Sequence, residues 1–281
     1  MRIGLIADIH SNLAALEAVL PAIKRHKPDL IVSLGDQVNL GPCPRETLAL
    51  LRAEGVACLH GNHERYILSA MAGDPAYAGA NFESLRFNAS LLSAREITFP
   101  KLLTLEGVTL CHALPEDDRF PVSDPAIAMP RLQAMRLDKP LHVLCGHSHN
   151  PVRYSLPNLT LESVSSAGCM DDGPAGFAQY AILDARDGCF SLRPLCVPYD
   201  TRPLRGQFLR GGMADFCPVM AHIICLQMEK NFDYLLRFVT LAQAIARERG
   251  EERITLDTWH EADRRFDWPG GVATAAFWRA R

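Results

Sequence analysis

Residues 3–12, IGLIADIHSN, combine a buried strand with a polar turn that carries two candidate metal ligands. The apolar run at residues 3–7 predicts the strand. Asp8 and His10 follow two residues apart, so both side chains can point to the same side of the chain. Ser11 and Asn12 offer N-caps for a helix over residues 13–25, in which leucine and isoleucine recur at helical spacing.

The same order of strand, polar tip and helix recurs twice more. Residues 30–34 predict a second strand that runs into Gly35-Asp36, and Pro44 suits the first turn of a helix to residue 54. Residues 56–59 predict a third strand before GNHE at residues 61–64, in which Glu64 is expected to brace the next helix. This β-α-β-α-β beginning predicts a largely parallel sheet with helices packed on it.

Later segments predict further strands and a helical end. Residues 102–105 and 108–111 flank a turn and predict a hairpin, and residues 141–145 predict another buried strand. Four strands at 152–156, 159–164, 177–183 and 189–197, separated by turns such as residues 187–188, are expected to form an antiparallel second sheet. These elements predict one domain over residues 1–198.

Composition shifts after Pro198. Residues 199–212, with three arginines, are expected to form a solvated loop, and the pattern beyond residue 215 is helical. Thr258 and Glu261 have the spacing of a capping box for a last helix. Residues 199–281 are therefore predicted to be a linker and helical extension, which could pack on the first domain, form a homo-oligomer contact or receive a partner.

Composition narrows the class of protein. The 281 residues are 48% hydrophobic with a net charge of −3, which permits a large core and gives no sign of an extended nucleic-acid surface. Nine cysteines, none in a C-x-x-C pair, indicate a reducing, cytoplasmic setting. No segment reaches the roughly 20 apolar residues of a membrane span, so no membrane partner is expected.

Seven side chains at predicted strand ends form a candidate ligand set for two metal ions. Its oxygen and nitrogen atoms, without a thiolate, favour manganese, iron, zinc or nickel over calcium. Two such ions roughly 3.5–4 Å apart can hold a hydroxide that attacks a phosphate ester in line. His63 is then placed to protonate the leaving oxygen or to stabilise charge there. The predicted ligands are Asp8, His10, Asp36, Asn62, His112, His147 and His149.

In their order along the chain these motifs resemble the calcineurin-like metallophosphoesterases. The sequence around Asp8, and Gly41-Pro42 after Gly35-Asp36, look like the small prokaryotic phosphodiesterase branch. The resemblance covers residues 1–198 and implies a four-layer α/β/β/α sandwich with a dinuclear site, here followed by a helical C-terminal extension.

The resemblance also implies a role for each predicted site residue. Asp8, His10 and His149 would hold one metal, with manganese the first choice. Asn62, His112 and His147 would hold the other metal. Asp36 would bridge the two ions, and His63 would be the catalytic histidine.

Two departures bear on the substrate. Protein Ser/Thr phosphatases carry Gly-Asp-x-x-Asp-Arg-Gly, whereas Gly35-Asp36 continues here as QVNLG. Residues 165–171, SSAGCMD, replace the Asn-Pro-Gly-Ser stretch of many small phosphodiesterases and are expected beside the site. The sequence therefore favours hydrolysis of a small phosphodiester or nucleotide. The alternatives are a phosphomonoesterase or Ser/Thr phosphatase-like enzyme, and a non-catalytic binding scaffold.

Overall fold

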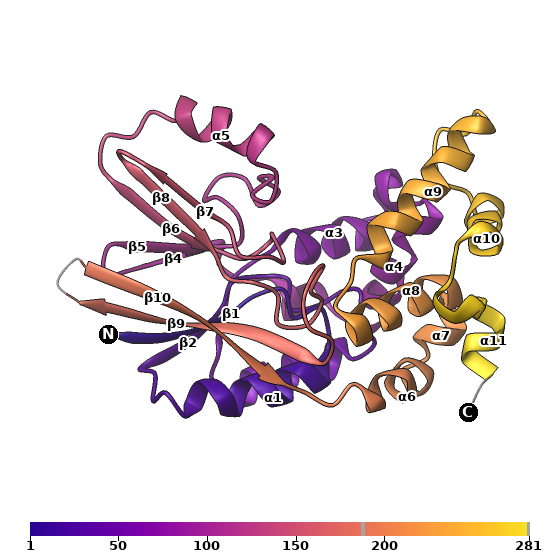
Figure 1. Cartoon of the computed structure of the whole chain (residues 1–281), viewed down its shortest axis with the longest axis horizontal. Coiled ribbons are helices and arrows are strands. Elements are labelled where there is room, and N and C mark those ends of the chain that lie inside the picture. The colour runs from indigo at the N-terminus through magenta and orange to yellow at the C-terminus, as the bar shows by residue number, and fades with distance from the viewer. Residues whose placement is uncertain (187–188, 280–281) are drawn as a thin grey trace.

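The computed structural model describes residues 1–186 and 189–279, and it has two five-stranded sheets that pack face to face (Figure 1). The turn predicted at residues 187–188 lies outside the described residues. The first sheet has the order β10-β9-β1-β2-β3, formed by Cys189–Pro198, Phe177–Arg186, Arg2–Ile6, Leu30–Ser33 and Ala57–Cys58. The second has the order β4-β5-β6-β8-β7, formed by Leu102–Leu105, Val108–Cys111, Leu141–Cys145, Leu159–Ser163 and Arg153–Leu156.

The parallel beginning follows the prediction, but the predicted separate antiparallel sheet is wrong. Strands β1, β2 and β3 pair in parallel. The β7–β8 hairpin joins β6 in the second sheet, with β8 parallel to β6. Strand β9 instead pairs antiparallel with β1 in the first sheet. Residues 180–183 of β9 are buried, so both faces of this strand must be covered. The β9–β10 hairpin alone cannot provide that cover.

Helices cover the outer faces of both sheets and complete four layers. Helix α1 (Leu13–Lys24) packs on the first sheet, where Leu16 belongs to the same buried cluster as Ile182. Helix α5 (Pro125–Ala134), which the sequence did not predict, packs Leu132 into the cluster of Leu161 on the second sheet. A third buried cluster joins the two sheets. The predicted α/β/β/α sandwich is confirmed.

Caps and turns explain where several helices begin. Asn12 accepts a hydrogen bond from the Ala15 N–H (3.1 Å), as its predicted capping role requires. Helix α10 (Leu256–Arg265) is capped by Thr255, which accepts from the Thr258 N–H, so the predicted capping box starting at Thr258 is wrong. The other helices before the extension are α2 (Pro44–Ala53), α3 (Asn62–Met71) and α4 (Glu83–Leu91).

The extension begins with a helix where the sequence predicted a loop. Leu204 and Phe208 are buried one helical turn apart in α6, which explains why this arginine-rich segment is ordered. The spacing of these two apolar residues, one helical turn apart, could have predicted this helix from the sequence. The helices of the extension, in addition to α10, are α6 (Arg202–Arg210), α7 (Met213–Phe216), α8 (Pro218–Lys230), α9 (Tyr234–Glu248) and α11 (Thr274–Arg279).

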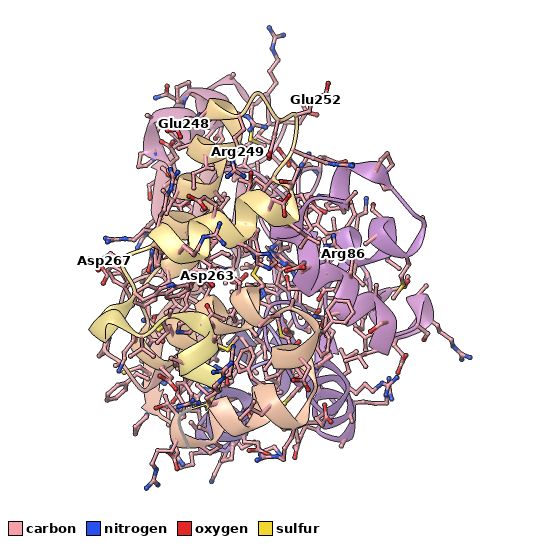
Figure 2. All side chains as sticks on the ribbon, turned by 90° about the vertical axis from the view of Figure 1, so that its right-hand side faces the viewer. Arg86, Glu248, Arg249, Glu252, Asp263 and Asp267 are labelled. Carbon is pink, nitrogen blue, oxygen red and sulfur yellow. The ribbon has the colours of Figure 1, made fainter. Side chains whose placement is uncertain are left out.

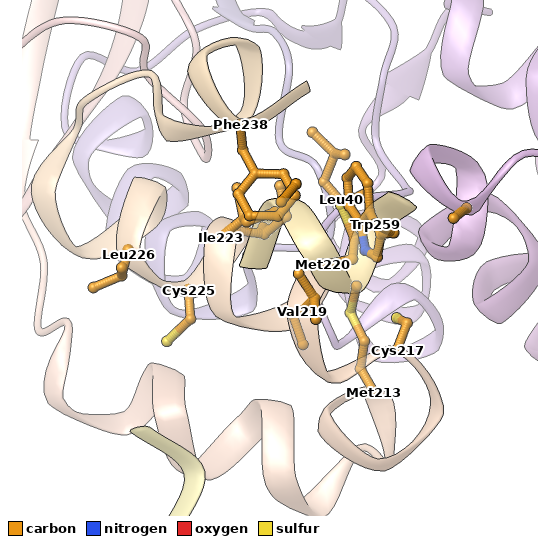
Figure 3. Packing of buried hydrophobic residues seen from close by; sticks show 14 of the residues in the cluster. Leu40, Met213, Cys217, Val219, Met220, Ile223, Cys225, Leu226, Phe238 and Trp259 are labelled. Carbon is orange, nitrogen blue, oxygen red and sulfur yellow. The ribbon is translucent and has the colours of Figure 1, made fainter. Parts of the chain in front are cut away.

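Helix α8 forms the centre of the extension. Its residues 219–228 are all buried, and Met220 packs in one cluster with Phe238, Trp259 and Leu40 of the first domain (Figure 3). Charged side chains such as Glu248 lie on the outer face of the extension (Figure 2). The extension thus packs on the sandwich, while the domain boundary after residue 198 stays a prediction. No helix within residues 1–186 or 189–279 is long and apolar enough to cross a membrane.

Candidate metal centre

The predicted ligands converge at the carboxyl ends of strands from both sheets. In the first sheet, β1 and β2 lead into Asp8, His10 and Asp36. In the second sheet, β5 and β6 lead into the three predicted histidine ligands. Parallel strands bring such residues to one sheet edge, and face-to-face packing brings the two edges together. The histidines from the second sheet are His112, His147 and His149.

The backbone is strained at five of these residues. The φ angles are 52° at Asp8, 51° at His10, 56° at Asp36, 67° at His147 and 54° at His149. Left-handed backbone costs an L-residue about 1–2 kcal/mol, and such conformations gather at functional sites. None of the five is a glycine or asparagine, so the sequence did not reveal this strain.

Glycines allow the close approach of the strand ends. At Gly35, with φ of 108°, a Cβ would lie 2.5 Å from Nδ1 of His112. At Gly61 a Cβ would overlap Oδ1 of Asp36. Larger residues at these two positions would therefore push the candidate ligands apart.

One donor group contains Asp8, His10 and His149, whose candidate ligand atoms lie within 4.8 Å of one another. Nε2 of His10 is 3.1 Å from Nε2 of His149, and Nε2 of His149 is 3.7 Å from Oδ1 of Asp8. Nδ1 of His149 contacts Oδ1 of Asp171 at 3.2 Å, which favours a lone pair on the other ring nitrogen. The sequence did not predict this role for Asp171.

A second donor group contains Asp36, His112 and His147, again within 4.8 Å. Nδ1–H of His112 donates to the Leu34 carbonyl (3.0 Å), so its Nε2 carries a lone pair in the neutral ring. That Nε2 lies 2.7 Å from Oδ1 of Asn62 and 3.3 Å from Oδ2 of Asp36. Asn62 thus joins this group, as the sequence predicted.

His63 lies beside both groups and is more exposed than His112 and His149. Its side chain is 21% exposed, against 1% for His112. Its Nε2 lies 3.8 Å from Oδ2 of Asp36. Nδ1 of His63 lies 2.5 Å from Nδ2 of Asn39, a neighbour that the sequence did not predict. Asn39 occupies the position of the second aspartate in the Gly-Asp-x-x-Asp-Arg-Gly pattern. This position in the pattern could have indicated that Asn39 lies near the site.

Glu64 braces the turns below the donors, as expected. Its carboxylate accepts hydrogen bonds from the backbone N–H groups of Gly61 (2.9 Å), Asp36 (3.0 Å) and Gln37 (2.9 Å). Burial and the charge of Asp36 raise the pKa of Glu64, while these N–H donors oppose that rise. Glu64 thereby joins the turn after β2 to the start of α3.

The loop at residues 165–171 lies beside the site, as the sequence predicted. Ser165 donates to the His149 carbonyl (2.6 Å), and Ser166 donates to the Asp8 carbonyl (2.8 Å). Both hydroxyls fix strained backbone from opposite sheets. The loop ends at Asp171, which contacts the His149 ring.

Burial and the neighbouring charges shift the pKa values of the donors. Burial raises the pKa of Asp8 to about 6. Burial and the charge of His112 together lower the pKa of His147 to about 3. For His112, burial lowers the pKa, but Asp36 and other carboxylates raise it to about 10. For Asp36, the histidines outweigh burial and hold the pKa well below its usual range.

The donor chemistry fits two cations. Lone pairs of Asn62, His112 and Asp36 face one another, and carbonyl and carboxylate oxygens cannot donate a hydrogen bond. Nδ1 of His10 is buried without a hydrogen-bond partner in the part of the chain that the structure describes. Converging lone pairs of this kind need a proton or a cation between them. Mixed imidazole and carboxylate donors suit the first-row transition metals.

Comparison with solved structures shows the same fold in other proteins. A metallophosphoesterase from Sphaerobacter thermophilus is 24% identical with a TM-score of 0.61, and the match covers 82% of this chain and 100% of that chain. A hypothetical protein from Pyrococcus horikoshii OT3 is 17% identical with a TM-score of 0.60, covering 79% and 97%.

A sequence relative and a family model extend this comparison. An uncharacterized protein from Methanocaldococcus jannaschii is 44% identical over 66 residues, which span 24% of this chain and only 27% of that relative. The family model described as calcineurin-like phosphoesterase matches residues 1–164, more than half of the chain. The protein therefore belongs to the calcineurin-like phosphoesterase family, and this membership indicates a metal-dependent phosphoesterase.

Proposed function

We propose that this protein hydrolyses a small phosphodiester or nucleotide substrate with the help of two metal ions. The observation that carries the proposal is the pair of donor groups at the meeting edges of the two sheets. Asp8, His10 and His149 would hold one ion. Asp36 would bridge both ions, and the rest of the second group would hold the other, namely Asn62, His112 and His147.

The proposed ions, with manganese the first choice, would neutralise charge on the phosphoryl oxygens and make water nucleophilic near neutral pH. Asp171 fixes the ring of His149 so that Nε2 faces His10 and Asp8. The Leu34 carbonyl orients His112 in the same way, with Nε2 facing Asn62 and Asp36. These partners prepare the donor atoms for binding before any ligand arrives.

His63 is proposed as the residue that stabilises charge on the leaving oxygen or protonates it. Its exposed edge and its place beside both donor groups support this role. Burial lowers the pKa of His63, which favours a neutral ring. The Asn39 amide donates to Nδ1, so the proton of the neutral ring resides on Nε2, from which it can donate a hydrogen bond that stabilises charge on the departing oxygen.

The charges around the site favour a diester over a monoester. A monoester at neutral pH carries more negative charge than a diester and benefits from a nearby arginine. The Asp-Arg-Gly positions hold Asn39 and buried Leu40 here. The nearby Arg65 is engaged by Asp118 through two hydrogen bonds of 2.8 and 2.7 Å.

A metal analysis followed by a substrate panel tests this proposal. The purified protein is expected to bind two Mn²⁺ per chain and to hydrolyse diesters and cyclic nucleotides faster than aryl monoesters. Dinucleoside polyphosphates complete the panel. A strong preference for monoesters would replace the diester proposal, and full metal binding without hydrolysis of any ester would favour a binding scaffold.

We also propose a reducing, cytoplasmic setting. All nine cysteines are free, and six of them, including Cys145 and Cys169, are buried with pKa values that burial raises. A thiol of this kind serves packing and does not need an oxidising compartment.

A further inference from the structure

A groove of about 350 Å³ leads away from the candidate metal centre toward the helical extension. His63 and His149 line its inner end. One wall comes from the first domain and includes Tyr66 of α3, and the other comes from α9 and includes Leu236 and Val239. The volume falls in the range of small-molecule sites, about 300–1,000 Å³.

The first-domain wall of this groove includes two phenyl-type rings, those of Tyr66 and Phe82. The ring of Tyr66 lies 5.5 Å from that of His63, measured between centroids. Tyr77 follows at 5.4 Å from Tyr66, and Phe82, which also lines the groove, follows at 5.2 Å from Tyr77. The rings of Tyr66 and Phe82, which line the groove with His63, offer faces on which a flat ligand group can stack.

The opposite wall is aliphatic and open to solvent. Leu236 is 64% exposed although it is large and apolar. Its neighbours Leu235 and Val239 are only partly buried against the extension. A ligand that enters between Leu236 and Tyr66 would therefore remove apolar surface from water on both of its sides.

The charges that line the groove argue against a second phosphate there. Among the described residues, neither lysine nor arginine lines the groove, whereas Asp171 and Asp233 do. The cavity of about 210 Å³ beside His112 is lined by basic and acidic side chains alike, and Asp118 pairs with Arg65 there. The groove therefore suits an uncharged group.

We propose that this groove binds a flat, uncharged aromatic group on the leaving alcohol of the substrate. The proposal rests on the phosphoesterase function above and narrows its substrate class to esters of aryl or nucleoside alcohols. Water would add its oxygen to phosphorus, the bond from phosphorus to the leaving oxygen would break, and the leaving oxygen would take the proton that the attacking water loses. The Nε2–H of His63 would donate a hydrogen bond to that oxygen as its charge develops. The aromatic part then occupies the groove between Tyr66 and Leu236.

The kinetic test compares Leu236→Asp with a control, Leu256→Asp. Leu256 is 53% exposed on α10 and lies outside the groove lining. Dibenzyl and diethyl phosphate release alcohols of similar acidity but different shape. Leu236→Asp is expected to lower the ratio of their kcat/KM values about tenfold, the lower end of what one apolar contact provides in discrimination. Leu256→Asp is expected to leave the ratio unchanged.

A binding test separates this proposal from the proposed activity. Adenosine and benzyl alcohol carry no phosphate, and their binding to the wild-type chain and to both variants is measured by NMR. Binding that Leu236→Asp weakens and Leu256→Asp preserves supports the groove, even if every ester proves inert. If adenosine binds more tightly, the leaving alcohol of the substrate is assigned to the nucleoside class. If benzyl alcohol binds more tightly, it is assigned to the plain aryl class.

Two results would overturn the groove proposal. One is an equal change of the kcat/KM ratio in both variants, and the other is the absence of probe binding near Tyr66 in the wild-type chain. If Leu236→Asp does not fold by circular dichroism, Val239→Thr, which keeps the side-chain shape, replaces it in both tests with the same expected direction.

Discussion

Gln227 of the extension donates a hydrogen bond of 3.0 Å from Nε2 to Oδ1 of Asp171, the same oxygen that contacts Nδ1 of His149. The other side of the Gln227 amide accepts from the Leu235 N–H (3.1 Å) at the start of α9. The Asp233 N–H also donates to the Asp171 carbonyl (3.0 Å). The helical extension is thus joined by hydrogen bonds to a proposed metal ligand.

The first prediction concerns this link. Gln227→Leu removes the bond to Asp171 and is expected to weaken Mn²⁺ binding about 10–100-fold, as the loss of an orienting partner commonly does. Isothermal titration calorimetry measures the affinity. Gln243→Leu, an exposed change on α9, is the control. Equal affinity in the wild type and in Gln227→Leu would show that the extension does not orient His149.

The second prediction concerns the donor shared between the proposed ions. Asp36→Asn removes a buried negative charge and is expected to reduce bound metal and to lower kcat at least about 100-fold, more than the loss of an orienting partner. His112→Ala should act in the same direction with the fold retained. Elemental analysis and circular dichroism are the measurements. Asp117→Asn, at a surface ion pair with Arg131, controls for the loss of a charge. Normal activity in a metal-loaded Asp36→Asn/His112→Ala double variant would reject the ligand assignment.

The third prediction concerns His222 in the extension. This ring stacks between Trp268 and Phe277, with centroids 4.0 and 3.9 Å away, and Nδ1 lies 3.0 Å from the Thr274 hydroxyl. Burial and the charge of Arg205 together lower the pKa of His222 to about 3. Asp263 is the facing carboxylate, and it accepts a hydrogen bond from Thr274 (2.6 Å).

The sign of the pH effect follows from the lowered pKa. Between about pH 6.5 and pH 3 the unfolded chain binds a proton on this histidine that the folded chain does not, so stability is lost as the pH falls. His222→Gln keeps an amide donor but cannot titrate. Between pH 7 and pH 5 the wild type is expected to lose about 2 kcal/mol more of its unfolding free energy than the variant. Urea unfolding followed by tryptophan fluorescence measures this difference, and parallel pH profiles would contradict the prediction.

The fourth prediction concerns removal of residues 215–281. Leu40 and Phe87 of the first domain belong to the same buried cluster as Trp259 and Phe238 of the extension. Exposing such side chains costs about 1.5–3 kcal/mol each, so the shortened chain is expected to be insoluble. Solubility and size-exclusion chromatography provide the measurement. A soluble, active monomer would instead support a surface that receives a partner.

Much of the sandwich could be predicted because its strands are continuous apolar runs. The strands Leu102–Leu105, Val108–Cys111 and Leu141–Cys145 have the predicted bounds. Which strands are neighbours could not be predicted, because β9 pairs with β1 across more than 170 residues of sequence. Side-chain periodicity reports which faces are buried but does not identify the partner strand.

The candidate site, too, could be predicted only in part. The motifs predicted that the seven donors gather, and the donors do lie together, although their role as ligands stays a prediction. Asn39 and Asp171 were missed because each acts through a hydrogen bond to a histidine distant in sequence. The left-handed backbone at Asp8 and His10 was missed because these residue types adopt it at only a small minority of positions, so their presence alone does not predict it.

The origin of the donors in both sheets has a consequence for how the chain unfolds. Asp8 and Asp36 extend from one sheet, and His112 and His147 extend from the other. An ion shared among them would act as a non-covalent cross-link, because neither sheet could come apart without releasing it. Ion binding would then raise the melting temperature of both sheets together and make their loss a single cooperative transition.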